Sequence, residues 1–188
     1  MIDEDYWKRV YKESWDFESK RIAHIIERIG AATGLRVLPV GMGTGSLAFI
    51  AGCASKHGHE RGEADLWVEN TNAYLEVTGP QVEHVPPEAA LWVRPDKVEN
   101  ARAHFPEHDT WLVHVLGAHG LIRAIRFDRE FFCRIDRKEF RLITPKPHGV
   151  VETYFEIPAS SSAVRTFDVL LIHLKSQFTP RPTSLNDS

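Results

Sequence analysis

Two short β-rich runs around a polar turn constrain the fold of this chain more than any other feature. Residues 64–68 (ADLWV) and 73–78 (AYLEVT) flank the tetrapeptide ENTN at 69–72, a pattern that predicts a β-hairpin. If the hairpin is centred on the middle of this turn, Asp65 lies directly opposite Glu76. Side chains alternate along a strand, so the two carboxylates share one face. That face also carries Glu63, Trp67, Tyr74 and Thr78, and the other face carries Leu66, Val68, Leu75 and Val77.

The two opposed carboxylates require something that offsets their repulsion. Cβ atoms of directly opposite residues stand about 5 Å apart, and like charges in that position destabilise a strand pair. A bound Mg²⁺ or Mn²⁺ would offset the charge, because hard cations take carboxylate and carbonyl oxygens as ligands. The alternative is a solvated face on which Asp65 and Glu76 tolerate each other in water.

Glu18 supplies a third carboxylate. Residues 6–29 are predicted to form a helix, because apolar side chains recur at intervals of three or four. The apolar stripe consists of Trp7, Tyr11, Trp15, Ile22, Ile25 and Ile29, and Glu18 fills its one gap. A carboxylate on a buried face is costly unless it is paired, so a metal ion or an arginine partner is expected. The alternative is a slight rotation of the helix that leaves Glu18 at the rim.

The remaining segments predict a mixed β-sheet flanked by helices. Strands are expected at 35–40, 91–93, 111–116, 121–127 and 150–157, a strand-like segment at 131–143, and helices at 95–104 and 163–176. Helices and groups of strands alternate, which indicates an α/β or α+β fold around one mixed sheet. Residues 1–177 are expected to form a single domain and residues 178–188 a frayed tail.

These features together resemble the PD-(D/E)XK phosphodiesterase superfamily, which includes restriction endonucleases and archaeal-type Holliday junction resolvases. Its signature is an aspartate followed, on the adjacent strand, by Glu-x-Lys; Asp65 and the tripeptide Glu76-Val77-Thr78 match it, and the order of elements over residues 6–127 is similar. The resemblance implies a restriction-endonuclease-like core, DNA as the partner, and a Mg²⁺ or Mn²⁺ ion. It also implies that Asp65, Glu76 and the Val77 carbonyl hold this ion, with Glu18 nearby. The implied reaction is hydrolysis of a phosphodiester, in which the ion polarises the phosphoryl group and lowers the pKa of the attacking water.

One departure from the signature concerns its lysine, which is Thr78 in this chain. In the family this lysine is thought to orient or activate the attacking water, and a threonine cannot supply its positive charge. Either a basic residue arrives from elsewhere, with Lys56, Arg61 and Lys97 as the candidates, or the site is inactive. An inactive site would leave a binding or structural module on the same fold.

A glycine-rich segment indicates a different class of enzyme. Residues 37–48 (VLPVGMGTGSLA) look like the first motif of methyltransferases that use S-adenosylmethionine, in which glycines let a turn approach the cofactor closely. That motif usually has an acidic residue at the position of Pro39, and the hairpin at 64–78 fits a βαβ order badly. A flexible loop beside a nuclease-like site is the simpler interpretation.

Two further groups of residues each have two interpretations. Cys53, His57 and His59 could bind a metal ion, but they lack the fourth ligand of a structural zinc site, which favours a polar loop. A basic stretch between residues 123 and 141 either contacts nucleic-acid phosphates or is a solvated face, since acidic residues dilute it. The stretch consists of Arg123, Arg126, Arg129, Arg134, Arg137, Lys138 and Arg141.

Composition excludes several classes of protein. The 188 residues are 43% hydrophobic and 26% charged, which is typical of a globular chain, and the net charge of −3 argues against coating nucleic acid by bulk charge. Two distant cysteines, Cys53 and Cys133, indicate a reducing compartment. The N-terminus has no signal-peptide pattern, and no apolar run approaches the roughly 20 residues of a membrane span. We therefore expect a soluble, cytoplasmic protein, and the sequence leaves a homodimer open.

Overall fold

The computed structural model describes residues 4–44, 46, 50, 54–81, 84–117, 120–146 and 151–178, with side chains from residue 12 onward in the first helix. The helices are α1 (Glu4–Thr33), the 3-10 helix η1 (Ala54–His57), α2 (Pro95–His104), α3 (Arg129–Asp136) and α4 (Phe167–Gln177). The strands are β1 (Val37–Pro39), β2 (Leu66–Val68), β3 (Ala73–Thr78), β4 (Leu91–Val93), β5 (Asp109–Leu116), β6 (Leu121–Arg126), β7 (Arg141–Ile143), β8 (Tyr154–Ile157) and β9 (Val164–Thr166).

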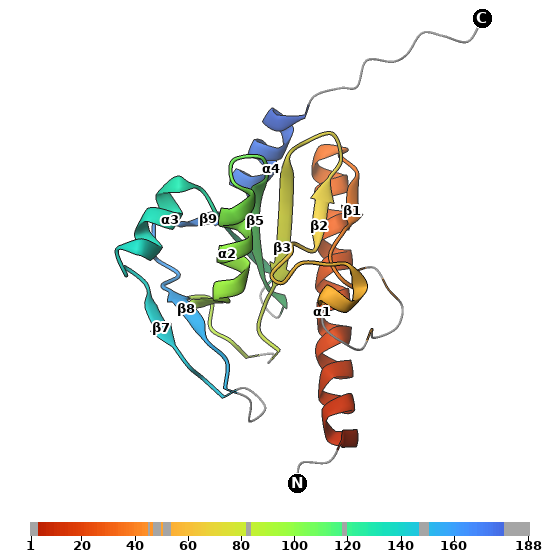
Figure 1. The fold of residues 1–188 in the computed structure, drawn as a ribbon. Helices are drawn as coiled ribbons and strands as arrows, with labels where there is room; N and C mark the ends of the chain where they lie inside the picture. Colours follow the sequence, from red (N-terminus) through yellow and green to blue (C-terminus); the bar gives the residue numbers. More distant parts are fainter. Residues whose placement is uncertain are drawn as a thin grey trace, which may run out of the picture.

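In the described residues the strands form two sheets (Figure 1). The larger sheet has six strands in the order β1-β2-β3-β5-β6-β9, and the smaller sheet has three in the order β4-β8-β7. Within the larger sheet β3 and β5 are parallel, whereas the other neighbours are antiparallel. The protein therefore has an α/β fold with a mixed sheet flanked by helices, as predicted. The smaller, wholly antiparallel sheet differs from the expectation of a single sheet.

Two apolar cores lie on opposite faces of the larger sheet. One core joins α1 and α4 to the sheet and includes Ile25 and Leu170. The other joins α2, α3 and the smaller sheet to the opposite face and includes Val98 and Phe131. The larger sheet is thus the middle layer, with α1 behind it in Figure 1 and the smaller sheet beside α2. No helix in the described residues combines the length and the apolar character needed to cross a membrane.

The predicted hairpin is confirmed, including its register. Trp67 pairs with Tyr74 across β2 and β3, which centres the turn where the alternation predicts. Asn70 adopts a left-handed backbone with φ of 61°, a conformation that asparagine tolerates better than most residues. The Trp67 indole N–H donates to the Thr71 carbonyl at 3.0 Å and closes the turn.

Two segments differ from the sequence prediction. Residues 131–143, expected to be strand-like, form α3 and then β7, because the Asp128 carboxylate caps the helix by accepting the Phe131 backbone N–H at 2.9 Å. Residues 163–176, expected to be helical throughout, begin as β9, which pairs with β6 before α4 starts. The predicted tail lies outside the described residues, apart from Phe178.

Candidate functional site

The hairpin brings Asp65 and Glu76 together. The Asp65 N–H donates to the Leu75 carbonyl at 3.0 Å and extends the β2–β3 pairing by one residue, so Asp65 lies opposite Glu76. Both residues are buried, with exposed fractions of 7% and 8%, so the interpretation as a solvated face is wrong. The two carboxyl groups interact, and each shifts the pKa of the other. The Asp65 carboxylate also accepts the Val77 backbone N–H at 2.7 Å, which fixes its orientation.

A lysine from α2 reaches this pair. Lys97 Nζ lies 2.6 Å from Glu76 Oε2 and donates to the Glu63 carbonyl at 2.9 Å. Pro95 takes the first position of α2, which suits its fixed φ and places Lys97 in the first turn beside the hairpin. Burial alone would lower the pKa of Lys97, but the charges of Glu76 and Asp65 raise it to about 12. Lys97 therefore keeps its positive charge across the physiological pH range.

Three acidic side chains, Asp65, Glu76 and Glu18, interact electrostatically around the hairpin. Burial raises the pKa of Asp65, and burial together with repulsion by Asp65 raises the pKa of Glu76. The pKa of Glu18 rises to about 7, first because of burial and then because of Asp65, against the opposing charge of Lys97. Three basic side chains, Lys97, Arg21 and Arg94, oppose this effect, because each of them lowers the pKa of Glu18. The raised pKa values favour the protonated acids, and a bound cation would favour their charged forms.

The position of Glu18 agrees with the predicted helix stripe. Ile22, Ile25 and Ile29 of that stripe are buried against the larger sheet, and Glu18 is partly buried on the same helix. The side chains of Trp7 and Tyr11 lie outside the described residues. Arg21, one turn further along α1, donates to the Pro80 carbonyl and also interacts electrostatically with Glu18.

Of the three basic candidates for the missing lysine, Lys97 is the one that contacts the paired carboxylates. Thr78 lies at the end of β3 and pairs with His114 of β5, on the same sheet face as Glu76. Lys56 is exposed on η1. The Arg61 Nε atom lies 3.3 Å from Asp96 Oδ2 instead.

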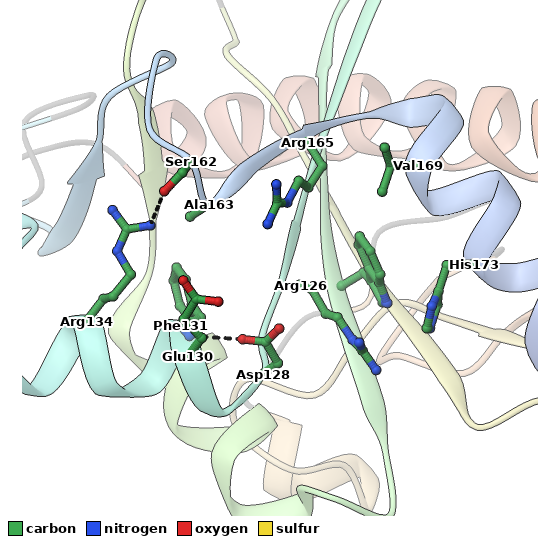
Figure 2. A pocket seen from close by; sticks show the side chains of 11 residues that line it. Arg126, Asp128, Glu130, Phe131, Arg134, Ser162, Ala163, Arg165, Val169 and His173 are labelled. Carbon is green, nitrogen blue, oxygen red and sulfur yellow. Dashed lines mark hydrogen bonds between the residues drawn. The ribbon is translucent and has the colours of Figure 1, made fainter.

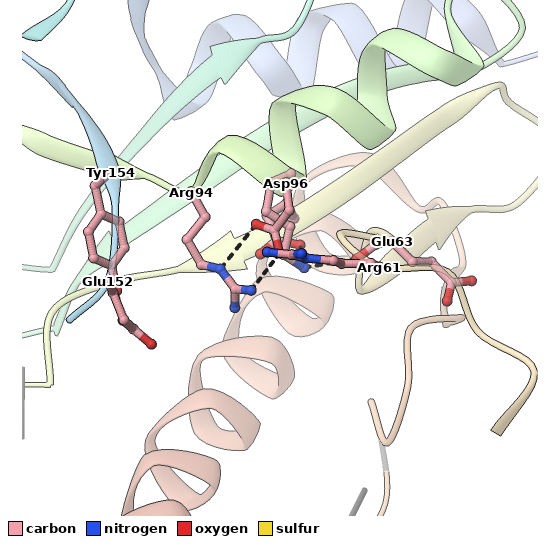
Figure 3. Close-up of polar contacts among 8 residues, drawn as sticks. Arg61, Glu63, Arg94, Asp96, Glu152 and Tyr154 are labelled. Atoms are coloured by element: carbon pink, nitrogen blue, oxygen red, sulfur yellow. Dashed lines mark hydrogen bonds and ion pairs between the residues drawn. The ribbon is translucent and has the colours of Figure 1, made fainter. Parts of the chain in front are cut away.

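Asp96 forms ion pairs with two arginines next to the Asp65–Glu76 pair. Arg94 Nε lies 3.1 Å from Asp96 Oδ1 and Arg94 Nη2 lies 2.5 Å from Asp96 Oδ2, a bidentate pair. Figure 3 shows Arg94 and Arg61 meeting Asp96 at the start of α2, with Tyr154 on the far side of Arg94. The Arg94 charge also reaches Glu76 and Glu18. Because its side chain is 51% exposed, Arg94 lies where the site opens to solvent.

Close packing explains Gly41 and Gly43 of the segment that follows β1, whereas Gly45 lies outside the described residues. A Cβ at Gly41 would lie 2.8 Å from the Ala64 carbonyl oxygen and 2.9 Å from Asp65 Cα. A Cβ at Gly43, whose φ is +74°, would lie 2.1 Å from the Trp15 ring. The next strand, β2, pairs with β1 in antiparallel fashion, whereas a cofactor-binding glycine turn connects a parallel strand to a helix. The loop therefore packs α1 against the hairpin.

The other sequence candidates do not form a site in the described residues. Cys53 lies outside them, and His59 Nδ1 pairs with Glu63 Oε2 at 2.6 Å. The basic stretch spans β6, α3 and β7, and most of its arginines have acidic partners, which favours the solvated face. The pairs are Arg126–Asp109, Arg134–Glu139, Arg137–Glu139 and Arg141–Glu156.

Sequence analysis placed Arg123 in the basic stretch but did not predict that its side chain is buried. Arg123 is 5% exposed, donates to the Pro87 and Ala89 carbonyls at 3.0 and 2.9 Å, and lies 3.3 Å from His114 Nδ1. Burial and the Arg123 charge lower the pKa of His114 to about 3, so the imidazole is neutral. The signal was present, because pairing the predicted strands 111–116 and 121–127 across their short turn places His114 opposite Arg123.

A cavity of about 260 Å³ lies elsewhere, between β6, β9, α3 and α4. Figure 2 shows that charged side chains of both signs line it, with three arginines against two acids: Arg126, Arg134, Arg165, Asp128 and Glu130. Trp111, which also lines it, belongs to the core on the α4 side, opposite the face that carries Glu76. This cavity is separate from the buried carboxylates.

The acidic side chains of the described residues do not form a metal site by themselves. Among the described residues there is no group of three or more His, Cys, Asp or Glu side chains close enough to hold a metal ion, so backbone oxygen would have to contribute. The Val77 N–H points at Asp65, and the carbonyl of the same residue points to the same strand edge. Asp65, Glu76 and this carbonyl offer only oxygen donors, the type that Mg²⁺ and Mn²⁺ prefer.

Comparison with known proteins adds no assignment: no family model matches the chain, and no curated protein is similar to it in sequence.

Proposed function

We propose that this protein is a metal-dependent phosphodiesterase that acts on DNA, with a site of the PD-(D/E)XK type whose lysine comes from α2. The observation that carries the proposal is the contact of 2.6 Å between Lys97 Nζ and Glu76 Oε2, beside Asp65. Lys97 supplies a positive charge beside the paired carboxylates, in a chain whose signature lysine is replaced by Thr78. The register of the hairpin supports the proposal independently, because it makes both acids converge.

In this proposal Asp65, Glu76 and the Val77 carbonyl hold Mg²⁺ or Mn²⁺, and Glu18 balances charge nearby. The ion would polarise the phosphoryl group and lower the pKa of the attacking water. The Val77 N–H keeps the Asp65 carboxylate oriented. Lys97 keeps its proton, so its Nζ can hold the attacking water by donating a hydrogen bond. Glu18, with a pKa of about 7, can accept a proton near neutral pH.

The test is a cleavage assay on linear, branched and single-stranded DNA with Mg²⁺ or Mn²⁺. Wild type is expected to cleave at least one substrate, and Asp65→Asn to lose cleavage. Lys97→Met is expected to lower the rate by about 10²- to 10³-fold, the usual loss when one positioned hydrogen-bond donor is removed from an active site. Lys56→Met is the matched control, because Lys56 is an exposed lysine outside the site.

A double variant makes the assignment of Lys97 sharper. If Lys97 replaces the signature lysine, Thr78→Lys should restore part of the activity that Lys97→Met removes. Cleavage that survives both Asp65→Asn and Lys97→Met would place the active site elsewhere. DNA binding by wild type with no cleavage of any substrate would refute catalysis and leave a binding module. Circular dichroism of each variant checks that it is folded.

A further inference from the structure

The outward face of the smaller sheet carries two aromatic side chains between two arginines. Alternation along β4 and β8 places Leu91, Val93, Phe155 and Ile157 in the core that the smaller sheet shares with α2 and α3. The intervening residues, Trp92 and Tyr154, therefore point outward. Their rings are 5.6 Å apart and inclined at 36°. The Trp92 side chain is exposed and that of Tyr154 is partly buried, so the Trp92 ring is accessible to a ligand.

Two exposed arginines flank the aromatic pair, and each is ion-paired with an acid. Arg94 comes directly after the end of β4; its side chain is 51% exposed and pairs with Asp96. Arg141 on β7 is 72% exposed and pairs with Glu156, which lies between Arg141 and Trp92 in the sheet. The stacked rings suit flat bases, and a phosphate would replace the acidic partner of the arginine that it contacts.

This surface continues directly into the candidate phosphodiesterase site. Arg94 is held by Asp96, and the next residue, Lys97, contacts Glu76. The charges of Arg94 and Asp96 also reach the Tyr154 hydroxyl, which donates to Glu152. In Figure 3 Tyr154, Arg94 and Asp96 follow one another from β8 to the start of α2. A strand whose phosphate lies at the carboxylates therefore has the Trp92–Tyr154 pair within reach of a neighbouring nucleotide.

We propose that Trp92 and Tyr154 form a stacking site for unpaired bases, so that the substrate is single-stranded DNA or an unpaired segment of it. This inference rests on the proposed function and specifies its substrate. Bases inside a duplex are already stacked on their neighbours, whereas an unpaired base has a free π-face for an aromatic side chain. Arg94 contacts the phosphate between the stacked base and the cleaved bond.

The experiment measures binding without catalysis. Fluorescence anisotropy of a labelled oligothymidylate is recorded in EDTA, with a blunt duplex and an oligonucleotide of the same length that contains abasic positions as comparison probes. Wild type is expected to bind oligothymidylate more tightly than either comparison probe. Trp92→Leu should weaken oligothymidylate binding about tenfold or more, and Trp92→Phe should retain most of it, because phenylalanine still stacks. Leu142→Ala is the matched control, since Leu142 is 56% exposed on β7 of the same sheet.

The outcomes separate this inference from the proposed function. Equal binding by wild type and Trp92→Leu, or equal weakening by Trp92→Leu and Leu142→Ala, would overturn the stacking site. Equal affinity of wild type for the abasic and intact oligonucleotides would also overturn it, because only phosphates would then be recognised. Asp65→Asn leaves the aromatic pair intact, so it is expected to keep the preference for intact over abasic oligonucleotide while it loses cleavage. The binding data therefore test the stacking site, and the cleavage data test the phosphodiesterase activity.

Discussion

At the scale of single residues, the candidate site holds buried charged groups that are stabilised by neighbours of opposite charge. Asp65 and Glu76 are buried and adjacent, and Lys97 compensates one negative charge of the pair. Removing one partner of such a group leaves an uncompensated buried charge, which costs more than a surface ion pair contributes. Substitutions that keep shape and remove charge, such as Asp65→Asn, are therefore better probes than truncation to alanine.

The sequence could predict the two acids but not the identity of their cation. Alternation and turn composition were sufficient to place Asp65 opposite Glu76, because both belong to one hairpin. Lys97 belongs to a helix that follows β4, and its distance from Glu76 depends on how α2 packs against the sheet. Periodicity along one segment carries no information about that packing, so Lys97 remained one of three candidates. Arg94 and Asp96 were missed for the same reason.

His114 predicts a pH dependence of stability. Its pKa is lowered to about 3, first by burial and then by the Arg123 and Arg21 charges, whereas an unfolded histidine titrates near 6.5. Below about pH 6.5 His114 binds a proton in the unfolded state but stays neutral in the folded state. This group therefore lowers the free energy of unfolding as the pH falls from about 6.5 towards 3, at up to about 1.4 kcal/mol per pH unit.

The measurement is urea denaturation of wild type and His114→Asn at several pH values between 7 and 4. His114→Asn should lose less stability over this range than wild type, even if it is less stable at pH 7. His84→Asn, which changes an exposed histidine, serves as the control and should follow wild type. Identical pH dependence in wild type and His114→Asn would contradict the buried neutral imidazole.

At the scale of elements, the loop after β1 fixes α1 to the hairpin. Gly43 has φ of +74° and lies against Trp15 of α1, and Gly41 lies against the backbone at Ala64 and Asp65. The same glycines suggested a cofactor loop when only the sequence was considered. A glycine pattern indicates that some group lies close to the backbone, but that group can be a cofactor or another part of the chain. Here the nearest atoms belong to the chain itself.

Gly43→Ala is expected to destabilise the protein more than an alanine at a comparable glycine. Any alanine with a positive φ costs about 1–2 kcal/mol. At Gly43 the new Cβ also meets the Trp15 ring, which must move. Gly58→Ala is the matched control, because Gly58 has φ of +77° and no atom within 4 Å of the added Cβ. Chemical denaturation should give the larger loss for Gly43→Ala, and equal losses would contradict the packing against Trp15.

The order of elements was predicted better than the type of each element. The strands and α2 of the central region follow the sequence pattern, whereas residues 131–143 were expected to be strand-like. In that segment Phe131 and Ile135 lie four residues apart, a spacing that also fits a helix. The Asp128 carboxylate caps this helix and so stabilises it over a strand. The second sheet depends on pairing between β4 and β8, whose sequence separation is too large for local patterns to indicate.

At the scale of the whole molecule, the candidate site lies where three parts of the fold meet. α1 brings Glu18 from one face of the larger sheet, the hairpin brings Asp65 and Glu76, and α2 brings Lys97 from the other face. The smaller sheet adjoins this point through Arg94. A ligand bound there would contact layers that are otherwise held together by the two apolar cores, so its binding should be detectable as global stabilisation.

A divalent cation is therefore expected to raise the temperature of unfolding. A ligand that binds only the folded state stabilises it by about 2.7 kcal/mol at one hundred times its Kd, which is about 5–10 °C for a chain of this size. Mn²⁺ titrated into metal-free wild type should give a saturable shift, and EDTA should reverse it. Asp65→Asn should abolish the shift, because it removes one of the carboxylates that would hold the ion. Glu99→Gln, which changes an exposed acid on α2, should leave it unchanged. A shift of equal size in wild type and Asp65→Asn would mean that Mn²⁺ binds away from the hairpin, and the metal site proposed here would then be wrong.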